Sequence, residues 1–125
     1  SGAATKLALN QLIASLTHAF SLSLRLVQQA GVPVATFMAI LRPSALHAPT
    51  FDENLQPMPH GHYDDPNFST ALLRKDLRLF LEEATAAGLQ VGGLQGLDDL
   101  LEQSSGSQLD HLDYCALHEL TQKSF

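Results

Sequence analysis

Residues 2–33 read GAATKLALNQLIASLTHAFSLSLRLVQQAGVP, and this stretch decides the fold of the chain. The run from Ala3 to Ala30 contains no glycine or proline. Gly31 follows this run directly and Pro33 comes two residues later, a pattern that commonly ends a helix. Apolar residues recur at steps of three and four: Leu9, Leu12, Ile13, Leu16, Phe20, Leu24 and Val27. The pattern predicts one long helix.

A second apolar stripe follows the same predicted helix and is formed by Leu7, Leu22 and Leu26. At about 1.5 Å per residue the helix would span on the order of 40 Å, as long as a domain of this size is wide. Two uncovered stripes would form a large apolar patch in water, so we expect a second subunit or a second domain to cover them. The uncharged run 7–24 contains too many amide, hydroxyl and imidazole side chains for hydrocarbon, so no membrane span is predicted.

The rest of the chain also reads as helix and loop. Short helices are expected over 33–41, 93–103 and 109–122, and a longer one over 68–88 that ends at Gly88. Residues 42–67 hold five of the six prolines and are expected to be mainly loop, with a helical turn around 51–55. No segment alternates with the two-residue period of a strand, and no solenoid repeat is present. The predicted fold is all-α, with several shorter helices packed around a long central one in a single domain, 1–125.

Composition narrows the class of protein. With 125 residues and 45% apolar content the chain can bury one modest core. The net charge is −6, and the seven basic residues form no run, so nucleic acid is not expected as a partner. The single cysteine, Cys115, cannot form an internal disulfide and suits a reducing compartment, for which we take the cytoplasm.

Lys6 and Asn10 stand one helical turn apart at the start of the long helix, among apolar neighbours. They are therefore expected to face one pocket. The spacing alone leaves another interpretation open, in which Lys6 sits at a frayed helix end and Asn10 makes a local hydrogen bond.

Gly2, Lys6 and Asn10 together resemble the G-x-x-x-K-x-x-x-N signature of the β-hydroxyacid dehydrogenases, the family of 3-hydroxyisobutyrate dehydrogenase within the 6-phosphogluconate dehydrogenase-like superfamily. A second signature of that family, a phenylalanine followed seven residues later by Lys-Asp-Leu, resembles Phe68 with Lys75-Asp76-Leu77. The resemblance extends over essentially the whole chain.

The resemblance implies a function and a set of site residues. The chain would be the C-terminal, substrate-side and dimer-forming half of an enzyme that interconverts a small β-hydroxyacid and its semialdehyde, or reduces glyoxylate or succinic semialdehyde. Lys6 would exchange the proton of the substrate oxygen. Asn10 would bind and orient the substrate or orient Lys6, and Gly2 would bind the substrate. Phe68, Lys75 and Asp76 would approach the cofactor, NAD or NADP. That cofactor would be held mainly by an N-terminal Rossmann domain that this chain lacks, so the chain alone is expected to be inactive.

The same residues also allow other interpretations. The charged run 74–78 is also typical of a solvated helix face, and the whole chain could be a non-catalytic helical dimerisation or scaffolding module. Within the superfamily a relative acting on an imine or a sugar acid is a further alternative, although Lys6 argues against the imine reductases. No metal site is expected, because the histidine-containing loop 60–65 offers no fixed set of ligands. Cys115 is expected to be a core residue, since no charged group would activate it.

Overall fold

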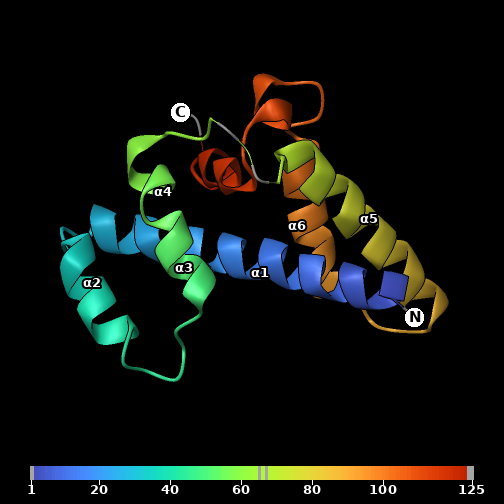
Figure 1. Cartoon of the computed structure of the whole chain (residues 1–125), viewed down its shortest axis with the longest axis horizontal. Helices are drawn as coiled ribbons and strands as arrows, with labels where there is room; N and C mark the ends of the chain where they lie inside the picture. Colours follow the sequence, from blue (N-terminus) through green and yellow to red (C-terminus); the bar gives the residue numbers. More distant parts are fainter. Residues whose placement is uncertain (1, 65, 67, 124–125) are drawn as a thin grey trace.

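The computed structural model describes residues 2–64, 66 and 68–123. Helix α1 (Gly2–Gln29) crosses the entire molecule, and every other element packs along it or against a helix that does (Figure 1). The remaining helices are α2 (Val34–Leu41), α3 (Pro49–Asn54), α4 (Pro57–His60), α5 (Thr70–Ala86) and α6 (Gly92–Glu102), followed by the 3-10 helices η1 (Gln108–His111) and η2 (Tyr114–Leu120). The described residues contain no strand, so the all-α prediction is confirmed.

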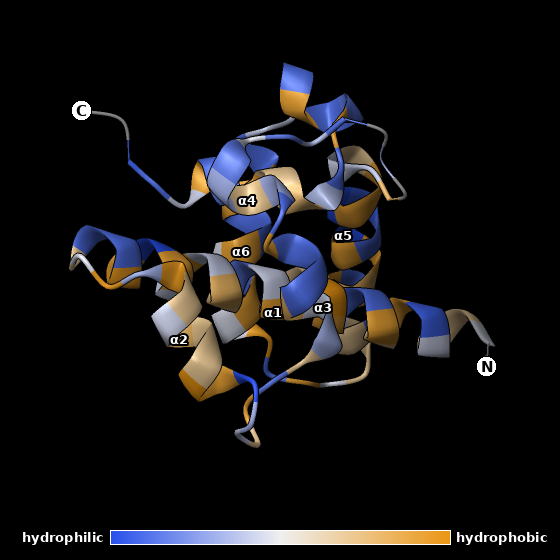
Figure 2. Ribbon diagram, turned by 60° about the vertical axis from the view of Figure 1, so that its left-hand side comes forward, coloured by the Kyte–Doolittle hydropathy of each residue, from blue (hydrophilic) through white to orange (hydrophobic). Residues whose placement is uncertain are grey.

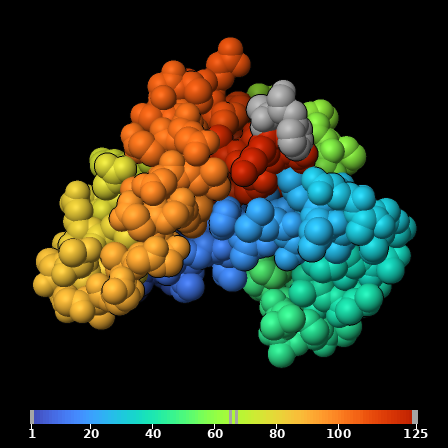
Figure 3. Space-filling view, turned by 180° about the vertical axis from the view of Figure 1, so that it is seen from behind, coloured from blue at the N-terminus to red at the C-terminus, as the bar shows by residue number. Residues whose placement is uncertain are grey.

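Helix α1 is shared by two apolar clusters. Near its N-terminal half, Ala14 belongs to a cluster with residues of α5, α6 and η2: Leu73, Leu77, Leu97, Leu101 and Leu117. Near its C-terminal half, Phe20 and Leu24 pack with residues of α2, α3 and α4: Met38, Phe51 and Met58. Figure 3 shows α1 passing between these two groups of helices from behind. The helix therefore connects two cores that would otherwise be separate.

The two long helices end at the predicted glycines. Gly31 has φ 79° and Gly88 has φ 81°, a left-handed conformation that side chains with a Cβ rarely adopt. In each case the residue after the glycine donates its N–H back into the last turn, from Val32 to the Val27 carbonyl at 2.8 Å and from Leu89 to the Ala84 carbonyl at 2.9 Å. These bonds satisfy carbonyl groups that the end of a helix leaves free.

Two segments differ from expectation. Within the expected loop 42–67, α3 lies at the predicted helical turn around 51–55, whereas α4 was not predicted, and residues 65 and 67 lie outside the described part of the chain. The expected helix 109–122 is two 3-10 helices separated by extended backbone at Leu112. The reason is tertiary: the Thr70 N–H donates to the Leu112 carbonyl and the Tyr114 N–H to the Phe68 carbonyl, both at 2.8 Å. This antiparallel pairing uses backbone groups that a continuous helix would need.

Part of α1 remains uncovered. Leu9, Leu12, Leu22 and Leu26 are exposed, and Leu26 keeps 68% of its accessible surface. Figure 2 shows apolar (orange) segments along the length of α1. By length and composition α1 is also the one described helix that could cross a membrane. Thr17 and Ser21 on its inner face are fully buried against the other elements, which supports our interpretation of α1 as a helix packed in protein.

Candidate functional site

The two sequence signatures meet where α1 packs against α5. The Asn10 side chain donates a hydrogen bond from Nδ2 to Oδ2 of Asp76, at 2.6 Å, across 66 positions of sequence. Asp76 is 9% exposed and Asn10 is half-buried. The structure thus brings a residue of the predicted substrate set into contact with a residue of the predicted cofactor set.

Gly2 and Lys6 precede Asn10 in α1 by about two turns and one turn, Lys75 directly precedes Asp76 in α5, and all three residues are exposed. Lys6 lies one turn before Asn10 in α1, so its side chain leaves the helix on nearly the same face. A Cβ added to Gly2 would meet no atom within 4 Å, so nothing in the described chain demands a glycine there. The side of the site that carries the two lysines is therefore open in this chain.

Phe68 packs against the apolar cluster that α1, α5, α6 and η2 share. It precedes α5, two turns before Asp76, and its ring is tilted against the ring of Tyr114 with the centroids 6.3 Å apart. The Tyr114 hydroxyl lies 3.4 Å from the hydroxyl of Thr50, and burial raises the pKa of Tyr114 to about 12. Tyr114 was missed at the sequence level, because no spacing signal links it to Phe68, 46 positions earlier in the chain.

A polar cavity of about 530 Å³ opens beside Tyr114, between α3, α4 and η2. It is lined by Glu53, Gln56, Pro57, His62, Asp64, Asp113, Tyr114 and Cys115. Three of these side chains are carboxylates, so the cavity is a poor match for an anionic substrate. No group of three or more His, Cys, Asp or Glu side chains that could hold a metal ion occurs in the described residues.

Cys115 is a core residue, as predicted. It is 3% exposed, its Sγ donates to Oδ1 of Asn54 at 2.8 Å, and burial raises the pKa of the thiol far above its usual range. The thiolate form that a nucleophile needs is therefore strongly disfavoured.

A second buried polar group ties η2 to the middle of α1. The His118 ring nitrogen Nδ1 lies 2.5 Å from the Ser21 hydroxyl, and Arg25 donates from Nη2 to the His118 carbonyl at 2.6 Å. Burial lowers the pKa of His118 to about 4, with a smaller contribution from the positive charge of Arg25. This neutral imidazole lies away from Lys6 and Asn10 along α1, and we assign it to the packing of η2.

The long helix α1 carries Lys6 and Asn10 near its start and packs against α5, which carries Lys75 and Asp76. These are the two helices that carry the resemblance to the helical C-terminal domain of the β-hydroxyacid dehydrogenases. Residues 1–121 match the family described as NAD-binding of NADP-dependent 3-hydroxyisobutyrate dehydrogenase, so the chain belongs to this family. No curated protein sequence matches the chain significantly.

Two solved structures share the fold. The 3-hydroxyisobutyrate dehydrogenase of Mycobacterium tuberculosis, crystallised with L-serine, superposes with a TM-score of 0.82 at 20% identity over 96% of this chain and 43% of that one. The 3-hydroxyisobutyrate dehydrogenase of Salmonella typhimurium superposes with a TM-score of 0.79 at 19% identity over 93% of this chain and 40% of that one. The chain thus spans about two fifths of the length of these proteins.

Proposed function

We propose that this chain is the substrate-side domain of an NAD(P)-dependent oxidoreductase that interconverts a small β-hydroxyacid and its semialdehyde. Glyoxylate and succinic semialdehyde are alternative substrates of the same reaction type. The observation that carries the proposal is the contact between the two signatures: Asn10, one turn from Lys6, is hydrogen-bonded to Asp76, next to Lys75. Membership of the 3-hydroxyisobutyrate dehydrogenase family supports the same conclusion.

Lys6 is the proton donor and acceptor of the proposed reaction. In the oxidative direction the Lys6 amine takes the proton of the substrate hydroxyl as the carbon–oxygen double bond forms; in the reductive direction the ammonium returns it. The bound nicotinamide supplies the acceptor and donor of the hydride that balances this proton. Asn10 binds and orients the substrate, with an amide that can both donate and accept hydrogen bonds, and the backbone at Gly2 borders the substrate.

Residues of α5 and the segment before it suit the cofactor side. Lys75 is exposed and positively charged, which fits an anionic dinucleotide, and half-buried Phe68 offers an apolar ring. We infer that an N-terminal Rossmann domain of the same polypeptide holds NAD or NADP and closes the open side of the site. The cytoplasm is the proposed location, and the proposed assembly is a homodimer.

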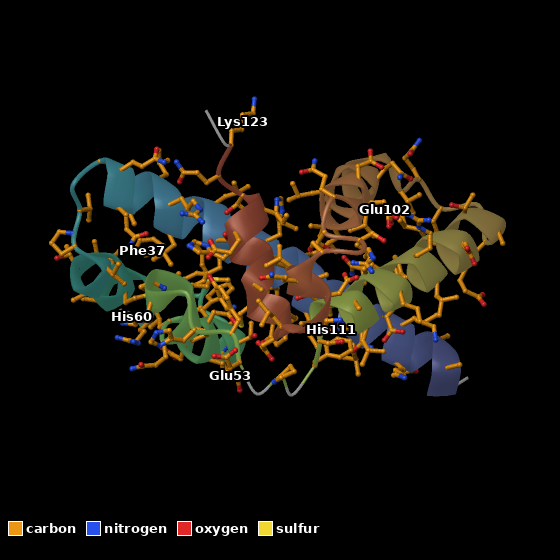
Figure 4. All side chains as sticks on the ribbon, turned by 90° about the horizontal axis from the view of Figure 1, so that it is seen from above. Phe37, Glu53, His60, Glu102, His111 and Lys123 are labelled. Carbon is orange, nitrogen blue, oxygen red and sulfur yellow. The ribbon has the colours of Figure 1, made fainter. Side chains whose placement is uncertain are left out.

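The proposed role of Lys6 is tested by Lys6→Ala in the full-length protein. A positioned proton donor accounts for about 10²–10⁴-fold of rate, so turnover of a β-hydroxyacid should fall by that order while the affinity for cofactor, measured by fluorescence titration, stays unchanged. Lys123→Ala is the matched control, because the Lys123 side chain points away from the body of the molecule at the C-terminal tail (Figure 4). Unchanged turnover in Lys6→Ala would refute the assigned role. A full-length protein without any dehydrogenase activity would favour a scaffolding module.

A further inference from the structure

Asp76 has an unusual partner for a buried carboxylate. Two other well-covered carboxylates that face α5 are paired with arginines: Asp98 accepts from Arg78 at 3.1 Å and Asp110 from Arg74 at 2.6 Å. Asp76 is 9% exposed, yet no lysine or arginine lies within 4.0 Å of it in the described part of the chain, and its hydrogen bond comes from the neutral amide of Asn10. A buried charge without a cation is costly to fold, so its presence needs a reason other than pairing.

The hydrogen bond fixes which way the Asn10 amide points. A carboxylate only accepts hydrogen bonds, so the amide must turn its NH₂ group toward Asp76. The carbonyl oxygen Oδ1 then lies on the opposite edge of the amide plane. No donor from residues 2–64, 66 or 68–123 reaches Oδ1, so this acceptor is available to a group outside the packed core.

The available acceptor belongs to a side chain one helical turn from Lys6. Residues four apart on a helix project from nearly the same face, and both side chains belong to the exposed edge of the α1–α5 contact. An ammonium group donates hydrogen bonds and accepts none, so a carbonyl oxygen one turn away complements it, whereas an NH₂ group there would repel it.

We propose that Asp76 is a positioning residue that locks the Asn10 amide so that its carbonyl oxygen faces Lys6 and accepts a hydrogen bond from the Lys6 ammonium. This inference rests on the proposed function, because it gives Asp76 a role in the same proton transfer. Asp76 acts through Asn10 and contacts neither substrate nor the reacting atoms.

The first test is Asp76→Asn in the full-length protein. An asparagine can accept from or donate to Asn10, so the amide orientation is no longer dictated. We expect kcat to fall about 10- to 100-fold, the range of a lost charge-assisted hydrogen bond, with KM changed less than about twofold. Asp98→Asn is the matched control: Asp98 is 3% exposed and also bonded to α5, and its loss should lower stability but leave kcat unchanged.

The second test exchanges the two residues in Asn10→Asp/Asp76→Asn. The exchanged pair can re-form an amide-to-carboxylate hydrogen bond, so the midpoint of urea denaturation should return to that of the parent. Turnover should stay low, because position 10 then lacks the oriented amide. If the hydrogen bond between residues 10 and 76 has only a structural role, both stability and turnover should recover in the exchanged variant. Recovery of turnover would overturn the proposal.

A spectroscopic readout separates this inference from the proposed function. With ¹⁵N-labelled asparagine, the Asn10 side-chain amide of the parent should show one proton shifted downfield by its bond to a carboxylate, and Asp76→Asn should remove that shift. The loss of this shift together with unchanged kcat would overturn the role of Asp76 alone. Failure of Lys6→Ala to lower turnover would instead overturn the proposed function.

Discussion

The imidazole of His118 is 3% exposed, between α1 and η2, and hydrogen-bonded to Ser21. Its pKa is lowered to about 4 by burial and by Arg25, whereas an unfolded chain would protonate near 6.5. Between these values the unfolded state binds more protons than the folded state. Stability is therefore complete above about pH 6.5 and decreases as the pH falls toward 4.

The change in the free energy of unfolding over this window should be at most about 3 kcal/mol, and urea denaturation between pH 4 and 7 measures it. His118→Gln should be less stable at pH 7 and should also flatten the dependence on pH. His60→Gln, at an exposed position, should keep the parent slope. An unchanged slope in His118→Gln would show that another group is responsible.

Some contacts of single residues can be predicted from the sequence, and others cannot. The shared face of Lys6 and Asn10 follows from the helical period, and the sequence therefore predicts it. The hydrogen bond from Asn10 to Asp76 joins helices 66 positions apart, and the resemblance placed Asp76 only near the cofactor. The contact of Tyr114 with Phe68 is likewise set by the packing of η2, and no local pattern encodes it.

At the scale of helices, the glycine that ends α5 can be compared with one inside α6. Gly88 has φ 81°, so Gly88→Ala should lower the free energy of unfolding by about 1 kcal/mol. Gly96 lies within α6 with open space around an added Cβ, so Gly96→Ala should raise it by about 0.5–1 kcal/mol. Thermal denaturation of the two variants should shift in opposite directions, and shifts of the same sign would contradict the assigned conformations.

Helices with strong local signals were predicted well, and those set by distant contacts were not. Helix α1 is encoded by its period and by Gly31, and α5 by its period and by Gly88. The C-terminal segment has a helical pattern too, but the backbone of residues 68–70 pairs with residues 112–114 and interrupts it. Secondary structure here was overridden by tertiary hydrogen bonds, which a single sequence does not display.

At the scale of the whole molecule, α1 has two different surfaces to cover. Its 28 residues span about 42 Å. The end with Lys6 must face the rest of the polypeptide if the site is to be completed. Leu22 and Leu26 lie about 24 Å or more from Lys6 along the axis, and by the helical period they point to a different side. A neighbouring domain at the Lys6 end leaves the other surface uncovered, so we propose that a second copy of this chain covers the surface of Leu22 and Leu26.

This surface suits a two-fold contact. Leu22 and Leu26 are 47% and 68% exposed, Ala19 and Ser23 beside them on α1 are small and exposed, and the charged Arg25 turns toward η2. An uncharged strip with small residues lets two copies of the helix approach closely, and in a symmetric dimer each leucine meets its counterpart's surface. The same strip left in water would be an aggregation liability.

The double variant Leu22→Glu/Leu26→Glu should therefore dissociate the full-length dimer. Placing four carboxylates in one apolar interface costs several kcal/mol, so the dimer dissociation constant should rise on the order of 100-fold or more, as measured by sedimentation equilibrium. Circular dichroism should be unchanged, because both side chains point away from the core. Leu89→Glu, at a residue 60% exposed beyond α5, is the control and should remain dimeric. A double variant that stays dimeric would place the interface elsewhere on the molecule. A parent protein that is monomeric would refute the proposed dimer.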